Sequence, residues 1–237
     1  MSDDTLRALE RRFRETESVE DEVAWLASRL RAGEIDSDRL DLAAYCGDEA
    51  ARRFSSRRPV EPSCVWTWGE GLVLAEVTPV GVRQEHPARW IRESTRSWAS
   101  QGFAREICVR ACLAAAESVA HAATHPSALA CVRAAANWIE MRSLDSLTRS
   151  SVAEDEADEA QRELMDLAGG DRDSVDPAAA ALEACQNAAL ASALEGMDLK
   201  AAARTMAAAA QVLPFEEVRA RVAAALVQWA LGTSRSS

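Results

Sequence analysis

The fold is decided by the stretch Pro177-Ala-Ala-Ala-Ala-Leu-Glu-Ala-Cys-Gln-Asn-Ala-Ala-Leu-Ala-Ser-Ala-Leu-Glu195, in which nine of the nineteen residues are alanine. Alanine has the highest intrinsic helix propensity, and proline suits the first position of a helix because it has no backbone N–H to leave unpaired. The stretch therefore predicts an α-helix over 177–195. Because alanine places little side chain between neighbouring helices, it also predicts a core of closely packed helices.

The composition of all 237 residues extends this prediction to the whole chain. About a fifth of the residues are alanine, against four Phe and one Tyr. A content of 48% hydrophobic and 27% charged residues is typical of a globular protein and excludes disordered and collagen-like classes. We therefore predict an all-α (mainly helical) fold, built as an irregular multi-helix bundle, because no fixed repeat period is visible.

Composition and chain start also bear on location. The longest apolar runs fall far short of the roughly 20 residues that span a bilayer, so no membrane span is expected. The start Met1-Ser2-Asp3-Asp4 is acidic, whereas a secretory signal begins with basic residues and then turns apolar. A cytoplasmic location is therefore expected.

Helix signals divide the chain into three segments and a tail. Residues 1–54 predict a small helical module, with a capping box at Ser18 and Asp21 and a left-handed helix end at Gly33. Residues 55–86 predict an irregular connector. Residues 87–231 predict the Ala-rich bundle, and 232–237 a flexible tail. The helices expected in the bundle cover 87–100, 103–124, 126–142, 145–168, 177–195, 198–212 and 214–231.

The connector carries two tryptophans. Cys64-Val-Trp-Thr-Trp68 and Leu72-Val-Leu-Ala-Glu-Val77 flank Gly69-Glu70-Gly71, which fits a short β-hairpin at 64–77 and fits an irregular connector equally well. On a strand, Trp66 and Trp68 share one face. Large aromatic side chains there serve either as core residues, the favoured interpretation, or as anchors for a binding partner.

Two parts of the chain resemble known groups of proteins. Leu6-Arg-Ala-Leu-Glu-Arg-Arg-Phe13, Ser18-Val-Glu-Asp-Glu-Val-Ala-Trp-Leu26 and Arg39-Leu-Asp-Leu-Ala-Ala-Tyr-Cys-Gly47 resemble a helical N-terminal module of uncharacterised bacterial proteins. Ile107-Cys-Val-Arg-Ala-Cys-Leu-Ala-Ala-Ala116 and His125-Pro-Ser-Ala-Leu-Ala-Cys-Val-Arg-Ala-Ala-Ala-Asn-Trp-Ile139 resemble the α-helical immunity proteins of bacterial polymorphic-toxin systems. The second resemblance implies a binding protein that blocks a toxin rather than an enzyme. The segment 55–86 departs from both patterns.

Neither catalysis nor a metal is expected. Cys108 and Cys112 share one helix face, as do His121 and His125, but Cys112 and His121 point to opposite sides of a continuous helix. Only a helix break, or Cys131 from the next helix, would unite them, so buried thiols acting as small apolar residues are the favoured interpretation. No phosphate loop or nucleophile turn occurs in the sequence. We expect no cofactor, and no disulfide framework from six scattered cysteines.

Charge supplies the clearest functional signal. The segment from Asp145 to Asp198 holds fourteen acidic and three basic residues, an excess of eleven negative charges that equals the net charge of the whole chain. The candidate partner-binding residues are the acidic side chains of its densest part together with the two tryptophans: Glu154, Asp155, Glu156, Asp158, Glu159, Glu163, Asp166, Trp66 and Trp68.

Two interpretations of this segment remain open. The favoured one is a solvated helix face that keeps an Ala-rich protein soluble, and the other is a docking surface for a basic protein, such as a basic toxin domain. Such a surface repels phosphates, so nucleic acid is not an expected partner. The predicted function is protein–protein interaction, as an immunity-like inhibitor of a toxin. An adaptor or scaffold without inhibitory activity is the alternative, and a metal-dependent enzyme a remote one.

Overall fold

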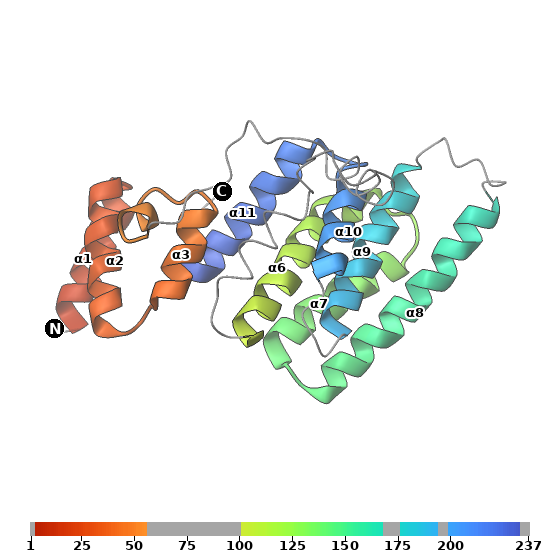
Figure 1. The fold of residues 1–237 in the computed structure, drawn as a ribbon, viewed down its shortest axis with the longest axis horizontal. Helices are drawn as coiled ribbons and strands as arrows, with labels where there is room; N and C mark the ends of the chain where they lie inside the picture. Colours follow the sequence, from red (N-terminus) through yellow and green to blue (C-terminus); the bar gives the residue numbers. More distant parts are fainter. Residues whose placement is uncertain (1–2, 56–100, 168–175, 194–198, 233–237) are drawn as a thin grey trace, which may run out of the picture. The chain divides into compact units, whose positions relative to one another are not determined.

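The computed structural model of the chain describes residues 3–55, 101–167, 176–193 and 199–232 (Figure 1). These residues contain nine α-helices, two short 3₁₀ helices and no strand, so the all-α prediction is confirmed for them. None of the helices in these ranges combines the length and the apolar character that a membrane crossing requires. The expected connector from residue 56 onward, the hairpin at 64–77, the helix at 87–100 and the tail lie outside the described residues.

The chain divides into two compact units. The first comprises Met1–Glu61 and Ala223–Ser237, and the second comprises Pro62–Val222. The sequence analysis assigned the last helix entirely to the bundle, whereas the division falls within it. Val218 and Val222 are buried before the boundary, whereas after it the Trp229 ring and the Leu231 backbone carbonyl bind arginines of the first unit.

The described helices of the first unit are α1 (Asp3–Thr16), α2 (Val19–Ala32), α3 (Ser37–Tyr45) and the 3₁₀ helix η1 (Ala51–Arg53). One half of the predicted capping box is present, because the Ser18 hydroxyl accepts the backbone N–H of Asp21 at 3.1 Å. The other half is absent, because the Ser18 N–H donates to the Thr16 hydroxyl at 3.3 Å and not to Asp21. Gly33 ends α2 with φ of +72°, the left-handed conformation that glycine adopts without steric cost. Residues 51–53 form the single 3₁₀ turn η1, in which the Asp48 carboxylate accepts the backbone N–H of Ala51 at 2.8 Å.

Arginine and tryptophan side chains hold the first unit together. Trp25 is buried and stacks on Phe13 with ring centroids 5.5 Å apart. The Arg29 guanidinium lies 4.7 Å from the Trp25 ring centroid and donates a hydrogen bond to the Leu231 carbonyl at the end of α11 (Phe215–Leu231). Arg39 lies 5.4 Å from the Trp229 ring. The end of α11 is therefore fixed to α2 and α3 by cation–π contacts and a charged hydrogen bond.

The second unit is a bundle around α9 (Pro177–Ala193). Its other described elements are α6 (Gln101–Val119), the 3₁₀ helix η3 (Ala120–Ala122), α7 (Ser127–Met141), α8 (Leu144–Leu167), α10 (Leu199–Ala209) and the first half of α11. Helix α9 packs against α6, α7, α8 and α10, and Figure 1 shows it between α10 and α8. The predicted start of α9 is confirmed, since the Asp176 carboxylate accepts the N–H of Ala178 at 2.9 Å.

The small side chains of α9 allow four other helices to pack closely around it. Its buried residues are mostly alanine, with Leu182 as the largest. The buried polar residue Asn187 donates from its side-chain amide to the Glu183 carbonyl of the same helix at 2.8 Å. The Ser192 hydroxyl donates to the hydroxyl of Ser150 on α8 at 2.8 Å. Arg105 of α6 lies 4.6 Å from the ring of Trp138 on α7 and donates to the Ser192 carbonyl of α9. Helices α6, α7 and α8 are thus each tied to α9 or its neighbours by specific contacts.

One predicted boundary was wrong in detail. The sequence predicted a helix over 103–124, whereas α6 ends at Val119 and the chain tightens into η3. The Ser118 hydroxyl donates to the Ala115 carbonyl three residues earlier at 2.6 Å. A side-chain donor of this kind competes with the regular backbone hydrogen bond and favours a tighter last turn.

The packing of α9 makes a testable prediction about volume. Ala188 is fully buried on α9, so Ala188→Leu inserts three carbon atoms where no space exists and is expected to lower the free energy of unfolding by about 1–3 kcal/mol. Urea denaturation measures this change. The matched control is Ala220→Leu on α11, an exposed position where the midpoint is expected to stay close to that of the wild type. Equal midpoints for both variants would contradict close packing around α9.

Candidate functional site

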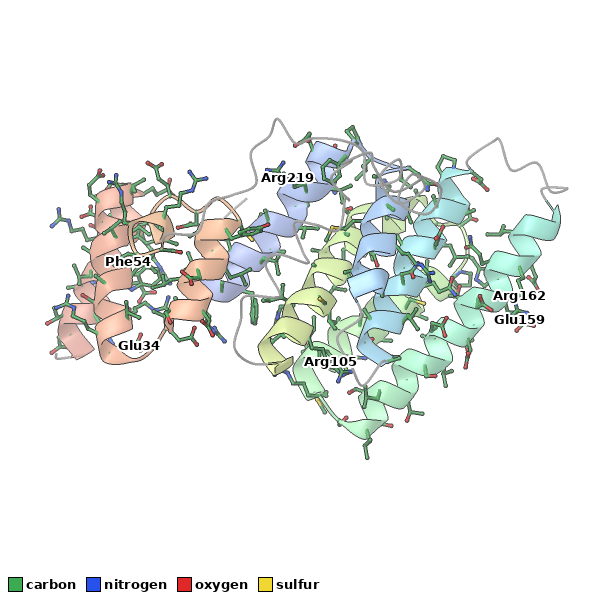
Figure 2. All side chains as sticks on the ribbon, viewed as in Figure 1. Glu34, Phe54, Arg105, Glu159, Arg162 and Arg219 are labelled. Atoms are coloured by element: carbon green, nitrogen blue, oxygen red, sulfur yellow. The ribbon has the colours of Figure 1, made fainter. Side chains whose placement is uncertain are left out.

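Helix α8 carries all seven acidic candidate residues, but the structure does not gather them on one face. Glu154 and Asp158 point toward α9. Glu156, Glu159 and Glu163 line a hollow beside α7. Asp155 is exposed and lines neither place, and Asp166 lies in the last turn of α8. Figure 2 shows Glu159 and Arg162 along the outer edge of α8. Trp66 and Trp68 lie outside the described residues.

The two carboxylates that face α9 are bound by other side chains. The Gln186 amide of α9 donates to Glu154 Oε1 and to Asp158 Oδ1, both at 3.2 Å. Arg162 forms an ion pair with Asp158 at 2.7 Å. The hydrogen bonds from Arg162 and then Gln186 lower the pKa of Asp158 below its ordinary value of 3.8. These acids therefore join α8 to α9 instead of offering free charge to a partner.

The remaining three carboxylates line one end of an open groove between α7 and α8. The first hollow has a volume of about 400 Å³, with Glu156, Glu159 and Glu163 on the α8 side and His125, Ser127 and Ala130 among the residues opposite. A second hollow of about 310 Å³ shares Ala130 and Glu156 and continues to Arg133, Arg149 and Val152. We call the two hollows together the α7–α8 groove.

The three groove carboxylates differ from Glu154 and Asp158 in their partners. Within the part of the chain that the structure describes, Glu156, Glu159 and Glu163 form no ion pair and accept no side-chain hydrogen bond. Glu156 and Glu159 on the same helix turn lie close enough to repel each other, as like charges three residues apart do. A ligand with positive charge is therefore the chemistry that this end of the groove favours.

At the other end, the groove is basic and apolar. Arg149 pairs with Asp145 at 2.6 Å, whereas Arg133 is exposed and has no ion-pair partner among the described residues. Val152 lies beside them with 51% of its surface exposed. The α7–α8 groove thus changes from negative through small apolar to positive along its length.

The histidines and cysteines contribute no metal site in the described ranges. Helix α6 ends before His121, which is exposed on η3, and the His125 Nδ1 atom lies 2.8 Å from the Ser127 hydroxyl at the start of α7. Within those ranges no three histidine, cysteine or acidic side chains converge as metal ligands would. The helix break that a joint site of the cysteine and histidine pairs requires is present at Ala120, but it does not bring the two pairs into one such group.

Four cysteines lie in the core of the second unit: Cys108, Cys112, Cys131 and Cys185. The Cys131 thiol donates to the Ala153 carbonyl at 3.1 Å. Burial raises the pKa of both Cys131 and Cys185 to about 12. These two thiols therefore stay protonated at neutral pH, and a protonated thiol is a poor nucleophile and a poor metal ligand.

The sequence predicted the acids of α8 as one surface, and it indicated neither the α7–α8 groove nor Arg133. His125 stood out only as a possible metal ligand. The spacing held part of the signal. Glu156, Glu159 and Glu163 recur at intervals of three and four residues, as do positions on one helix face, and Glu154 and Asp158 are four apart on another. The spacing of the acidic residues did not indicate which face of α8 is covered by α9.

Comparison of the chain with protein-family models, with curated proteins and with solved structures finds no match. The candidate site is therefore interpreted from its own geometry.

The Gln186 bridge predicts a pH-dependent loss of stability. Gln186→Ala removes both hydrogen bonds to the α8 carboxylates and is expected to lower the free energy of unfolding by about 0.5–1.5 kcal/mol at neutral pH. Gln186, after Arg162, lowers the pKa of Asp158 in the folded chain, so the part of this stabilisation that acts through the Asp158 charge is present above 3.8 and is lost as the pH falls below that value. In urea unfolding, the difference between wild type and variant should therefore shrink in acid, whereas Gln228→Ala, on an exposed residue of α11, should match the wild type throughout.

The buried thiols predict the opposite pH dependence. Because the folded-state pKa values of Cys131 and Cys185 lie near 12 and the ordinary value is 9.0, the unfolded chain releases these protons first as the pH rises. The free energy of unfolding is expected to fall above pH 9, by about 1 kcal/mol per thiol at pH 10. Apart from the other four cysteines, only one tyrosine and one lysine of the chain have ordinary pKa values near this range. The double variant Cys131→Ala, Cys185→Ala should show a shallower decline in urea unfolding than Cys46→Ala, and equal slopes would contradict the prediction.

Proposed function

We propose that the chain is a protein-binding protein that contacts a basic partner through the carboxylates of the α7–α8 groove. The observation that supports the proposal is the contrast along α8. Glu154 and Asp158 are bound by Gln186, whereas Glu156, Glu159 and Glu163 have no ion-pair partner among the described residues and line an open hollow. Concentrated negative charge steers a basic protein toward such a surface and raises its association rate.

We further propose that this binding blocks a toxin in the cytoplasm, as an immunity protein does. The support is the resemblance of 107–116 and 125–139 to α-helical immunity proteins, and the second of these stretches contains one wall of the groove, from His125 to Arg133. Blocking needs only an occupied surface on the toxin, so the proposal requires no catalytic group. A nucleic-acid partner is disfavoured because the unpaired carboxylates repel phosphate.

An adaptor without inhibitory activity is the second candidate. Several large apolar side chains of α7 and α8 are exposed, among them Leu129, Met141, Leu144 and Val152. Apolar side chains placed in this way favour association with another helix. The activity of the partner separates the two candidates, because a toxin that this chain neutralises supports inhibition and a harmless partner supports an adaptor.

Removing the groove charges tests the proposal. The variant Glu156→Gln, Glu159→Gln, Glu163→Gln is expected to recover at least tenfold less partner than the wild type in affinity purification from the native host, because it loses the charge attraction without a change of shape. Partners are identified by mass spectrometry, then expressed alone and with this chain to compare cell growth.

The matched control is Glu15→Gln, Glu20→Gln, Glu49→Gln. It changes the net charge by the same amount at exposed positions of the first unit, which contributes no residue to the lining of the groove. It should recover as much partner as the wild type. Equal recovery by all three proteins at low salt would contradict a role for the groove carboxylates, and recovery of an acidic partner would contradict the proposed charge complementarity.

A further inference from the structure

The charged side chains of the α7–α8 groove follow a fixed order along α8, and this order restricts which partner segments can bind there. Arg149 and Val152 come first, and Glu156, Glu159 and Glu163 follow. From Arg149 to Glu163 the helix rises by about 21 Å at 1.5 Å per residue, which corresponds to about four helical turns. A partner segment that satisfies the whole groove therefore needs an acid, an apolar side chain and basic side chains in that order over the same length.

The floor of the groove is built of small residues. Ala130 and Ala134 of α7 and Ala153 and Ala160 of α8 line it, and the apolar Val152 stands at its rim. A floor of this kind lets a helix approach closely, as α9 does on the other face of the same two helices. The charged rim then sets which helix is accepted.

We propose that the α7–α8 groove docks one amphipathic helix of the partner, with an acidic residue in its N-terminal half, a central apolar side chain and two or three Lys or Arg residues in its C-terminal half. This inference rests on the proposed function and names the chemistry of the partner. The basic residues meet Glu156, Glu159 and Glu163, the apolar side chain meets Val152 and Ala130, and the acid meets Arg133.

The helix dipole fixes the direction of the docked segment. Acidic residues stabilise the N-terminus of a helix and basic residues its C-terminus. A segment with its acid first and its basic residues last is therefore the better helix, and its order matches that of the groove only when it runs parallel to α8. An antiparallel segment would need its basic residues first, which opposes its own dipole.

The test uses a synthetic helical peptide as the probe. It spans about four turns, with Glu near its start, Leu in the middle and three Lys residues in its second half at spacings of three and four, and Ala elsewhere. The control peptide has the same composition, with each Lys moved by two residues so that the basic side chains leave the Leu face. Titration into the full ¹⁵N-labelled chain is followed by amide chemical shifts.

We expect saturable shifts confined to α7 and α8 for the designed peptide and at least tenfold weaker binding for the control peptide. The triple Glu156→Gln, Glu159→Gln, Glu163→Gln variant should also bind at least tenfold more weakly, and the Glu15, Glu20 and Glu49 control variant should bind as the wild type does. Ala130→Trp, which fills the shared part of the groove, should abolish binding. If it disturbs folding, the exposed Arg133→Glu should weaken binding by repelling the peptide's acid.

Absence of saturable shifts, shifts outside α7 and α8, or equal binding of the two peptides would overturn the inference. Its failure is distinguishable from failure of the proposed function. If the triple variant loses a native partner but no peptide binds, the proposed function is supported and the docking of a helix is rejected. If the peptide binds but no native partner is recovered, the docking of a helix is supported and the proposed function is not.

Discussion

The close approach of α9 to its neighbours is the constraint on which the second unit depends. Four helices pack around α9, and its buried positions are mostly alanine with the short side chains of Cys185, Asn187 and Ser192 among them. Small side chains bring helix axes together, and close axes multiply dispersion contacts while leaving no room for adjustment. The hydrogen bond between Ser192 and Ser150 and the Gln186 bridge then select one register of α8 on α9. The alanine contacts allow α8 and α9 to pack closely, and these polar contacts fix how the two helices are aligned.

This register determines the electrostatics of α8. A helix with acidic residues on every side cannot expose or bury all of them alike, and the position of α9 decides which are bound. Asp158 is held between Arg162 and Gln186, so its charge is largely compensated. The carboxylates on the α7 side keep theirs. The charge of the α7–α8 groove is therefore a consequence of packing inside the bundle, and a change at the α8–α9 contact would alter that charge.

Much of the helical framework could be predicted from the sequence, because its signals are local. Ser18, Asp176 and Gly33 bind or turn the backbone within a few residues of themselves, and the structure confirms each of them. The end of α6 was missed because a serine hydroxyl competes with the backbone there, which propensity alone does not register. The division of the acidic residues between two faces was missed for a different reason. It depends on where α9 lies, and that position results from contacts between residues far apart in the chain, such as Glu154 and Gln186.

The split of α11 between the two units has a consequence for biosynthesis. Arg29 and Arg39 of the first unit bind Leu231 and Trp229, and Leu231 follows Arg29 by 202 residues. Domains usually fold from the N-terminus as synthesis proceeds. Here α1 to α3 lack part of their own core until translation reaches α11. Until then, Arg29 and Arg39 lack the carbonyl oxygen and the indole ring that they bind in the folded chain.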